Sequence, residues 1–109
     1  MATTYKVLGQ SAPAATTAVD LYTVPSATSA VISTLVVCNR AAADATYRVA
    51  VRPAGAALAN QHYVAYDVTV GAGDSTTLTL GITAATTDVV TVYASSADLT
   101  FSAFGSELS

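Results

Sequence analysis

The stretch ATYRVAVR, Ala45–Arg52, alternates between apolar and polar side chains. Successive side chains of an extended chain point to opposite faces, so this pattern separates the apolar residues from the polar ones. One face carries Tyr47, Val49 and Val51, and the other carries Thr46, Arg48 and Arg52. The stretch is therefore predicted to form a half-buried β-strand.

The same two-residue period recurs along most of the chain. In HYVAYDVTV, 62–70, it sets Val64, Tyr66, Val68 and Val70 against Tyr63, Asp67 and Thr69, and in STTLTLGI, 75–82, it groups Leu78, Leu80 and Ile82. Further strands are expected at 4–8, 18–24, 31–38, 89–95 and 99–104. About eight short strands without helical crossovers predict one all-β domain over residues 1–109, an antiparallel β-sandwich or jelly roll.

The segment AVISTLVVCNR, 30–40, is apolar on both faces before it ends in Asn39 and Arg40. Its alternation places Ile32, Val36 and Cys38 on one face and Val31, Leu35 and Val37 on the other. A strand of this kind needs apolar cover on both sides. One cover is the partner sheet, and the second is either a loop of the same chain or a neighbouring copy.

The sequence makes a specific prediction for two of the segments that connect the strands. SSAD, 95–98, is the best candidate for a tight hairpin turn between two strands. AGAALAN, 54–60, is either a turn of helix or an ordered loop of small residues.

The composition is poor in charge. Charged residues make up 10% of the chain, hydrophobic residues 52%, and the net charge is −3 with four cations. Nucleic-acid binders concentrate Lys and Arg on one face, so no nucleic-acid partner is expected. With few charges to keep copies apart, association with other subunits is expected, and the alternative is a soluble monomer with a Thr/Ser-rich exterior. No apolar run is long enough to span a bilayer, and MATTYKVLG lacks a signal-peptide block, so synthesis in the cytoplasm is expected.

Catalytic and metal-binding patterns are weak. Cys38 lies in an apolar run that opposes thiolate formation and is expected in the core, and the single His62 cannot build a His-rich metal site. VGAGDSTT, 70–77, lacks the lysine and helix of a phosphate loop, so a turn between strands explains its glycines. The scattered aspartates suit turns. No cofactor, no metal and no enzymatic activity are expected.

Five residues are candidates for contacts with other subunits: Arg40, Arg48, Arg52, Tyr63 and Phe104. The arginines either pair with carboxylates of a neighbour and set its orientation, or solubilise a polar face. Tyrosine and phenylalanine suit a sandwich core and an oligomer contact alike.

Three stretches, DLYTVPSATSAVISTLVVCNR, YRVAVRPAGAALANQHYVAYDV and DVVTVYASSADLTFSAFGSEL, cover most of residues 20–108. In overall pattern the chain resembles small virion structural proteins of tailed bacteriophages, especially cyanophage-like ones. The resemblance implies a place in the particle and no catalytic role.

The expected function is that of a capsid decoration, or cement, protein that ties neighbouring major capsid subunits together as a trimer or other small oligomer. The alternative is a tail, neck or baseplate component, such as a fibre-anchoring module. A carbohydrate-binding or adhesion module on the virion surface is a third hypothesis, and it predicts an exposed aromatic cluster.

Overall fold

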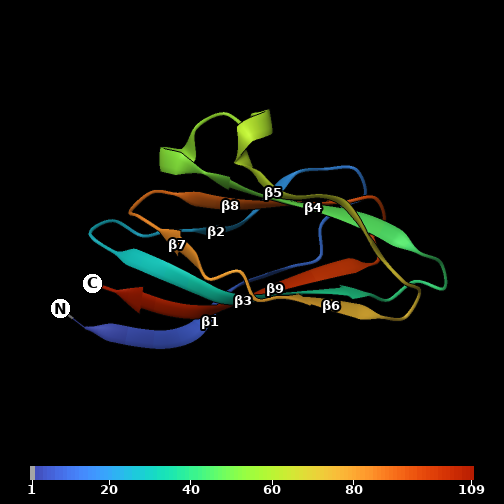
Figure 1. The fold of residues 1–109 in the computed structure, drawn as a ribbon, viewed down its shortest axis with the longest axis horizontal. Coiled ribbons are helices and arrows are strands. Elements are labelled where there is room, and N and C mark those ends of the chain that lie inside the picture. Colours follow the sequence, from blue (N-terminus) through green and yellow to red (C-terminus); the bar gives the residue numbers. More distant parts are fainter. Residues whose placement is uncertain (1) are drawn as a thin grey trace.

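Residues 2–109 are described by a computed structural model, in which two antiparallel sheets pack face to face (Figure 1). Nine strands are present in this range: β1 (Thr3–Ser11), β2 (Val19–Thr23), β3 (Ser29–Asn39), β4 (Ala45–Arg52), β5 (Tyr63–Val70), β6 (Ser75–Leu78), β7 (Ile82–Ala84), β8 (Val89–Ala94) and β9 (Leu99–Leu108). The two short helices in it are 3-10 turns, η1 (Pro53–Gly55) and η2 (Asn60–His62). The all-β sandwich predicted from the alternation is confirmed.

The strand order is that of a jelly roll. One sheet, called sheet A, has the order β1-β9-β3-β6, with β7 also paired to β3, and the other, sheet B, has the order β2-β8-β4-β5. The first strand thus pairs with the last, β2 with β8, β3 with β6 and β7, and β4 with β5. This nesting is what results when one long antiparallel hairpin folds over into two sheets.

The core lies between the sheets, where the strands turn one face inward. Tyr47 of β4 meets Phe101 of β9 edge to face, with ring centroids 6.3 Å apart. Both side chains are almost fully buried, together with Val49 as the alternation of β4 predicts. Edge-to-face aromatic contacts add to the burial energy, so this pair helps to hold sheet A on sheet B.

The predicted strand at 75–82 is divided into β6 and β7. Gly81 has a φ of +60°, a left-handed conformation that interrupts the ladder, and both pieces pair with β3. Leu80 lies in this interruption and is 48% exposed, so its expected place on the apolar face beside Leu78 and Ile82 is wrong. The division explains why nine strands appear where about eight were expected.

A bulge in β3 changes which residues of this strand share a face. The register with β9 shifts between Ile32 and Thr34, so Ile32 and Leu35 both point into the core. The expected grouping of Ile32 with Val36 and Cys38 is therefore wrong, because one extra residue reverses the alternation beyond the bulge. Cys38 is half-buried on the outer face of sheet A and does not lie in the core as expected.

A second bulge reverses the faces of β5. Asp67 has a φ of +51°, and the register with β4 shifts between Tyr47 and Val49. Val64 and Tyr66 are consequently exposed, while Ala65 packs against the core. Of the four residues predicted for the apolar face of this strand, Val70 alone is buried.

The predicted SSAD hairpin is also wrong. Residues 95–98 join β8 to β9, and these strands belong to different sheets, so the segment is a connection between the layers. The segment 54–60 begins in η1 and ends in η2, with residues 56–59 as a loop between them. Together they form the link from β4 to β5 that projects at the top of Figure 1.

Candidate interaction surfaces

The outer face of sheet A carries an exposed apolar patch, formed by Tyr5, Val7, Val31 and Phe104. Tyr5 is 84% exposed and Val7 49%, both on the edge strand β1. Val31 and the half-buried Phe104 follow on β3 and β9, and the four residues line a shallow hollow of about 530 Å³. Large apolar side chains that converge on one open face mark an interaction surface more often than scattered ones do.

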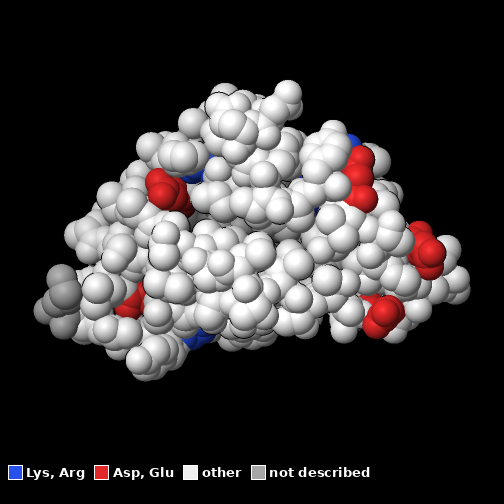
Figure 2. All heavy atoms as spheres, in the orientation of Figure 1, with Lys and Arg blue, Asp and Glu red and all other residues white. Residues whose placement is uncertain are grey.

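Charged side chains are sparse on the molecule. Figure 2 shows one face of the molecule, on which isolated acidic groups and very little basic surface stand among uncharged residues. Near the apolar patch, Lys6 is paired with Glu107 at 3.1 Å. Little electrostatic repulsion therefore opposes the approach of another protein.

Arg48 lies in a cluster of tyrosines on the outer face of sheet B, here called the tyrosine–arginine cluster. Its guanidinium carbon is 4.2 Å from the ring centre of Tyr66 on β5 and 4.4 Å from that of Tyr93 on β8. Tyr63 meets Tyr66 edge to face, with ring centres 4.9 Å apart. Arg48 Nε also donates to Asp67 at 2.7 Å. This hydrogen bond to Asp67 raises the pKa of the Arg48 guanidinium above its ordinary value.

Arg52 is engaged by its own chain. Its Nε donates to Thr91 Oγ1 and one Nη to Asp20, both at 2.9 Å, while the other Nη donates to the carbonyl oxygens of Gly55 and Ala56. The planar guanidinium therefore fastens η1 and β2 to the middle of sheet B. Within the fold, Arg52 joins these segments through its hydrogen bonds. A role for Arg52 in contacts between subunits stays a prediction.

Arg40 follows β3 at the end of the sandwich. It is exposed, and its Nη2 donates to the carbonyl of Ala97 in the connection between β8 and β9. The five candidate residues therefore do not form one surface. Arg48 and Tyr63 lie together on sheet B, and Phe104 lies on sheet A.

A partly buried polar contact between the sheets was not visible in the sequence. Tyr22 of β2 donates its hydroxyl proton to Glu107 of β9. The pKa of Tyr22 is raised, mainly by burial and secondly by this hydrogen bond. The same hydrogen bond is the main cause that lowers the pKa of Glu107. The two residues are 85 positions apart in the chain, so no local pattern relates them.

Three further polar residues have hydrogen-bond partners within the chain. His62 is buried, and its Nδ1 accepts a hydrogen bond from the amide of Ala59 within the β4–β5 link. Asp88 accepts from the amides of Ala54 and Ala85, and Asp74 from that of Ser75, which is the turn chemistry expected of aspartate. In the part of the chain from residue 2 onward, no group of three or more metal-ligating side chains occurs.

The described residues contain no helix with the length and apolar character needed to cross a bilayer. The fold and the two surfaces define a β-sandwich of jelly-roll topology with one apolar and one aromatic outer region. In comparisons with known proteins, no family model, no curated protein and no solved structure matches the chain.

Proposed function

We propose that the chain is a non-enzymatic structural protein of a tailed-phage virion, and specifically a decoration protein that cements the capsid shell. The observation that carries the proposal is the apolar patch of Tyr5, Val7, Val31 and Phe104. It occupies an open sheet face on a chain with only 10% charged residues. Burying such a patch against another protein gains free energy in proportion to the apolar area removed from water.

The architecture suits this role. Jelly rolls occur in viral capsid proteins and in lectins, and this likeness is one of fold, which does not by itself define a function. A rigid two-sheet module offers fixed surfaces that a symmetric shell can repeat many times, so modest contacts add up over the particle. We take the partners to be major capsid subunits and further copies of this chain, as a trimer or another small oligomer.

Cementing follows from mass action. A protein that binds the assembled shell and not its separated subunits shifts the balance towards the shell. Particles that lack this chain should therefore release their contents at a lower temperature than complete particles, and adding the purified chain should restore the higher temperature. Equal release temperatures for complete and depleted particles would contradict cementing.

A count of copies per particle tests the location separately. Hundreds of copies are expected for a protein that covers the shell. A few multiples of three or six would favour the tail, neck or baseplate alternative, and absence from purified particles would contradict both virion roles.

A further inference from the structure

The tyrosine–arginine cluster presents a ring that is both exposed and fixed in orientation. Tyr66 is 56% exposed, yet it contacts the Arg48 guanidinium and the ring of Tyr63. Arg48 is held in turn by Tyr93, its direct neighbour across the β4–β8 ladder. An aromatic side chain held in this way loses little conformational entropy when a ligand stacks on it, because its rotamer is already set.

Polar groups lie directly beside the exposed ring. Arg48 donates to both carboxylate oxygens of Asp67, at 2.7 and 3.4 Å, and the Asp67 side chain is 47% exposed. Within residues 2–109, the Nη1 group of Arg48 has no hydrogen-bond partner. The carboxylate also keeps free acceptor positions, so a ligand beside Tyr66 would meet donors and acceptors together.

From this arrangement we propose that the cluster is a binding site for a neutral saccharide. The stacking platform is the face of the Tyr66 ring that the Arg48 guanidinium does not cover, and Arg48 and Asp67 are the hydroxyl-binding groups. A sugar ring has one face of C–H groups, which pack on an aromatic ring, and a rim of hydroxyls, which donate and accept hydrogen bonds.

The charges of the site favour a neutral saccharide over charged ligands and over a protein partner. The paired charges of Arg48 and Asp67 cancel, so neither an anion nor a cation gains from long-range attraction. A dry protein interface would remove water from both charged groups, which is costly unless further partners replace the water. Hydroxyl groups of a sugar supply such partners.

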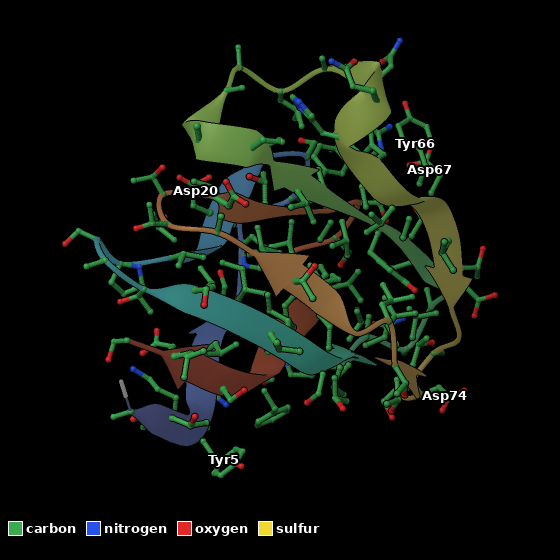
Figure 3. The ribbon with its side chains drawn as sticks, turned by 60° about the vertical axis from the view of Figure 1, so that its left-hand side comes forward. Tyr5, Asp20, Tyr66, Asp67 and Asp74 are labelled. Atoms are coloured by element: carbon green, nitrogen blue, oxygen red, sulfur yellow. The ribbon has the colours of Figure 1, made fainter. Side chains whose placement is uncertain are left out.

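The site and the apolar patch lie on opposite sides of the sandwich. In Figure 3, Tyr5 extends from the lower side, whereas Tyr66 and Asp67 extend from the upper right. The two surfaces belong to different sheets, so both can be occupied at once. A copy attached to a particle through Tyr5 would therefore present Tyr66 to the surrounding solution. The saccharide site itself does not depend on the virion role.

The experiment is a titration of the free, isotopically labelled protein, followed by backbone amide NMR. The probes are soluble oligomers of glucose, galactose, mannose and N-acetylglucosamine, with a galacturonate oligomer as the anionic comparison. We expect at least one neutral oligomer to give saturable shifts centred on Arg48, Tyr66 and Tyr93. The galacturonate oligomer should bind more weakly than that oligomer.

Variants separate a stacking site from a nonspecific contact. Tyr66→Ala should weaken binding about tenfold or more, because it removes the ring, while Tyr66→Phe should retain binding. Asp67→Asn removes the charge, and asparagine, like aspartate, tolerates the positive φ at this position. This variant should also weaken binding. The control Tyr5→Ser, on the other sheet, should bind as the unchanged protein does.

Three results would overturn the proposal: no neutral oligomer shifts these residues, the shifts persist at full strength in both Tyr66→Ala and Asp67→Asn, or the anionic oligomer alone binds. Because the free protein is used, such a failure leaves the virion role to its own test on particles.

Discussion

Tyr22 and Glu107 form a hydrogen bond that joins the two sheets, from the β2 hydroxyl to the β9 carboxylate. Lys6 of β1 donates to the other carboxylate oxygen of Glu107 at 3.1 Å. The Glu107 side chain is only 14% exposed, so these two donors replace most of the water that it loses on folding. The contact ties β1 and β9, at one edge of sheet A, to the edge strand of sheet B.

Removal of the Tyr22 hydroxyl should destabilise the protein. Tyr22→Phe leaves the Glu107 carboxylate with one donor fewer, so we expect the free energy of unfolding to fall by about 1–3 kcal/mol. Urea unfolding followed by circular dichroism measures the change. An unchanged free energy of unfolding would show that water replaces the tyrosine at no cost.

The same contact should make stability depend on pH in the acid range. The pKa of Glu107 is lower in the folded protein than in the unfolded chain, where it is about 4.3. Its contribution is therefore fully present above that unfolded value and is lost as pH falls through the folded value. Glu107→Gln should differ most from the unchanged protein near neutral pH, and the difference should shrink below about pH 4. Urea midpoints across this range test it, and a constant difference would contradict it.

Tyr47 provides the opposite case to Tyr22. Its hydroxyl is buried in the core and has no hydrogen-bond partner among residues 2–109, and burial raises its pKa. Tyr47→Phe removes a polar group that was already unpaired, so the free energy of unfolding should stay the same or rise by about 1 kcal/mol. The same urea assay applies. A clear loss of stability would mean that the hydroxyl has a partner, such as a buried water.

Gly105 permits the close approach of β9 to β3. An added Cβ atom would lie 1.9 Å from the carbonyl oxygen of Val31, which is backbone and cannot move aside. Gly105→Ala should therefore lower the free energy of unfolding by about 1–3 kcal/mol. The matched control is Gly71→Ala, whose added Cβ would meet no atom closer than 3.8 Å. Thermal unfolding of both variants measures the difference, and equal losses would contradict the steric explanation.

The apolar patch can be tested without disturbing the core. Tyr5 is 84% exposed, so Tyr5→Ser should leave thermal stability nearly unchanged. It should weaken binding to particles depleted of this protein about tenfold or more if Tyr5 anchors the contact. Co-sedimentation with such particles measures the binding. Leu58→Ser is the control, because Leu58 is an exposed apolar residue in the β4–β5 link on the other sheet. Equal binding by both variants would exclude the patch as the docking surface.

The alternation of the sequence predicted the strands well and their faces less well. The range of β4 was predicted fully, and that of β3 within a few residues. The bulges at Ser33 and Asp67 were missed, because a bulge is decided by pairing with a distant strand and leaves no strong local signal. Each bulge reversed the expected orientation of the residues on one side of it.

The candidate surfaces were predicted only in part. Arg48, Tyr63 and Phe104 were singled out from the sequence, and the structure places them on two exposed surfaces. Tyr5 was not singled out, although it is the most exposed large apolar residue of the patch. The partners of Arg48 lie on β5 and β8, so the cluster exists only after these strands pair with β4.

By itself, the sequence determined an all-β fold, because a two-residue hydrophobic period can bury its apolar face only in paired sheets. It also determined that the chain carries few charged residues. The tertiary structure alone decided the nesting of the strands, the bulges, and the contacts of Tyr22 with Glu107 and of Arg48 with Tyr66. The physical reason is that local patterns follow neighbours along the chain, whereas strand pairing and sheet packing join residues that are distant in it.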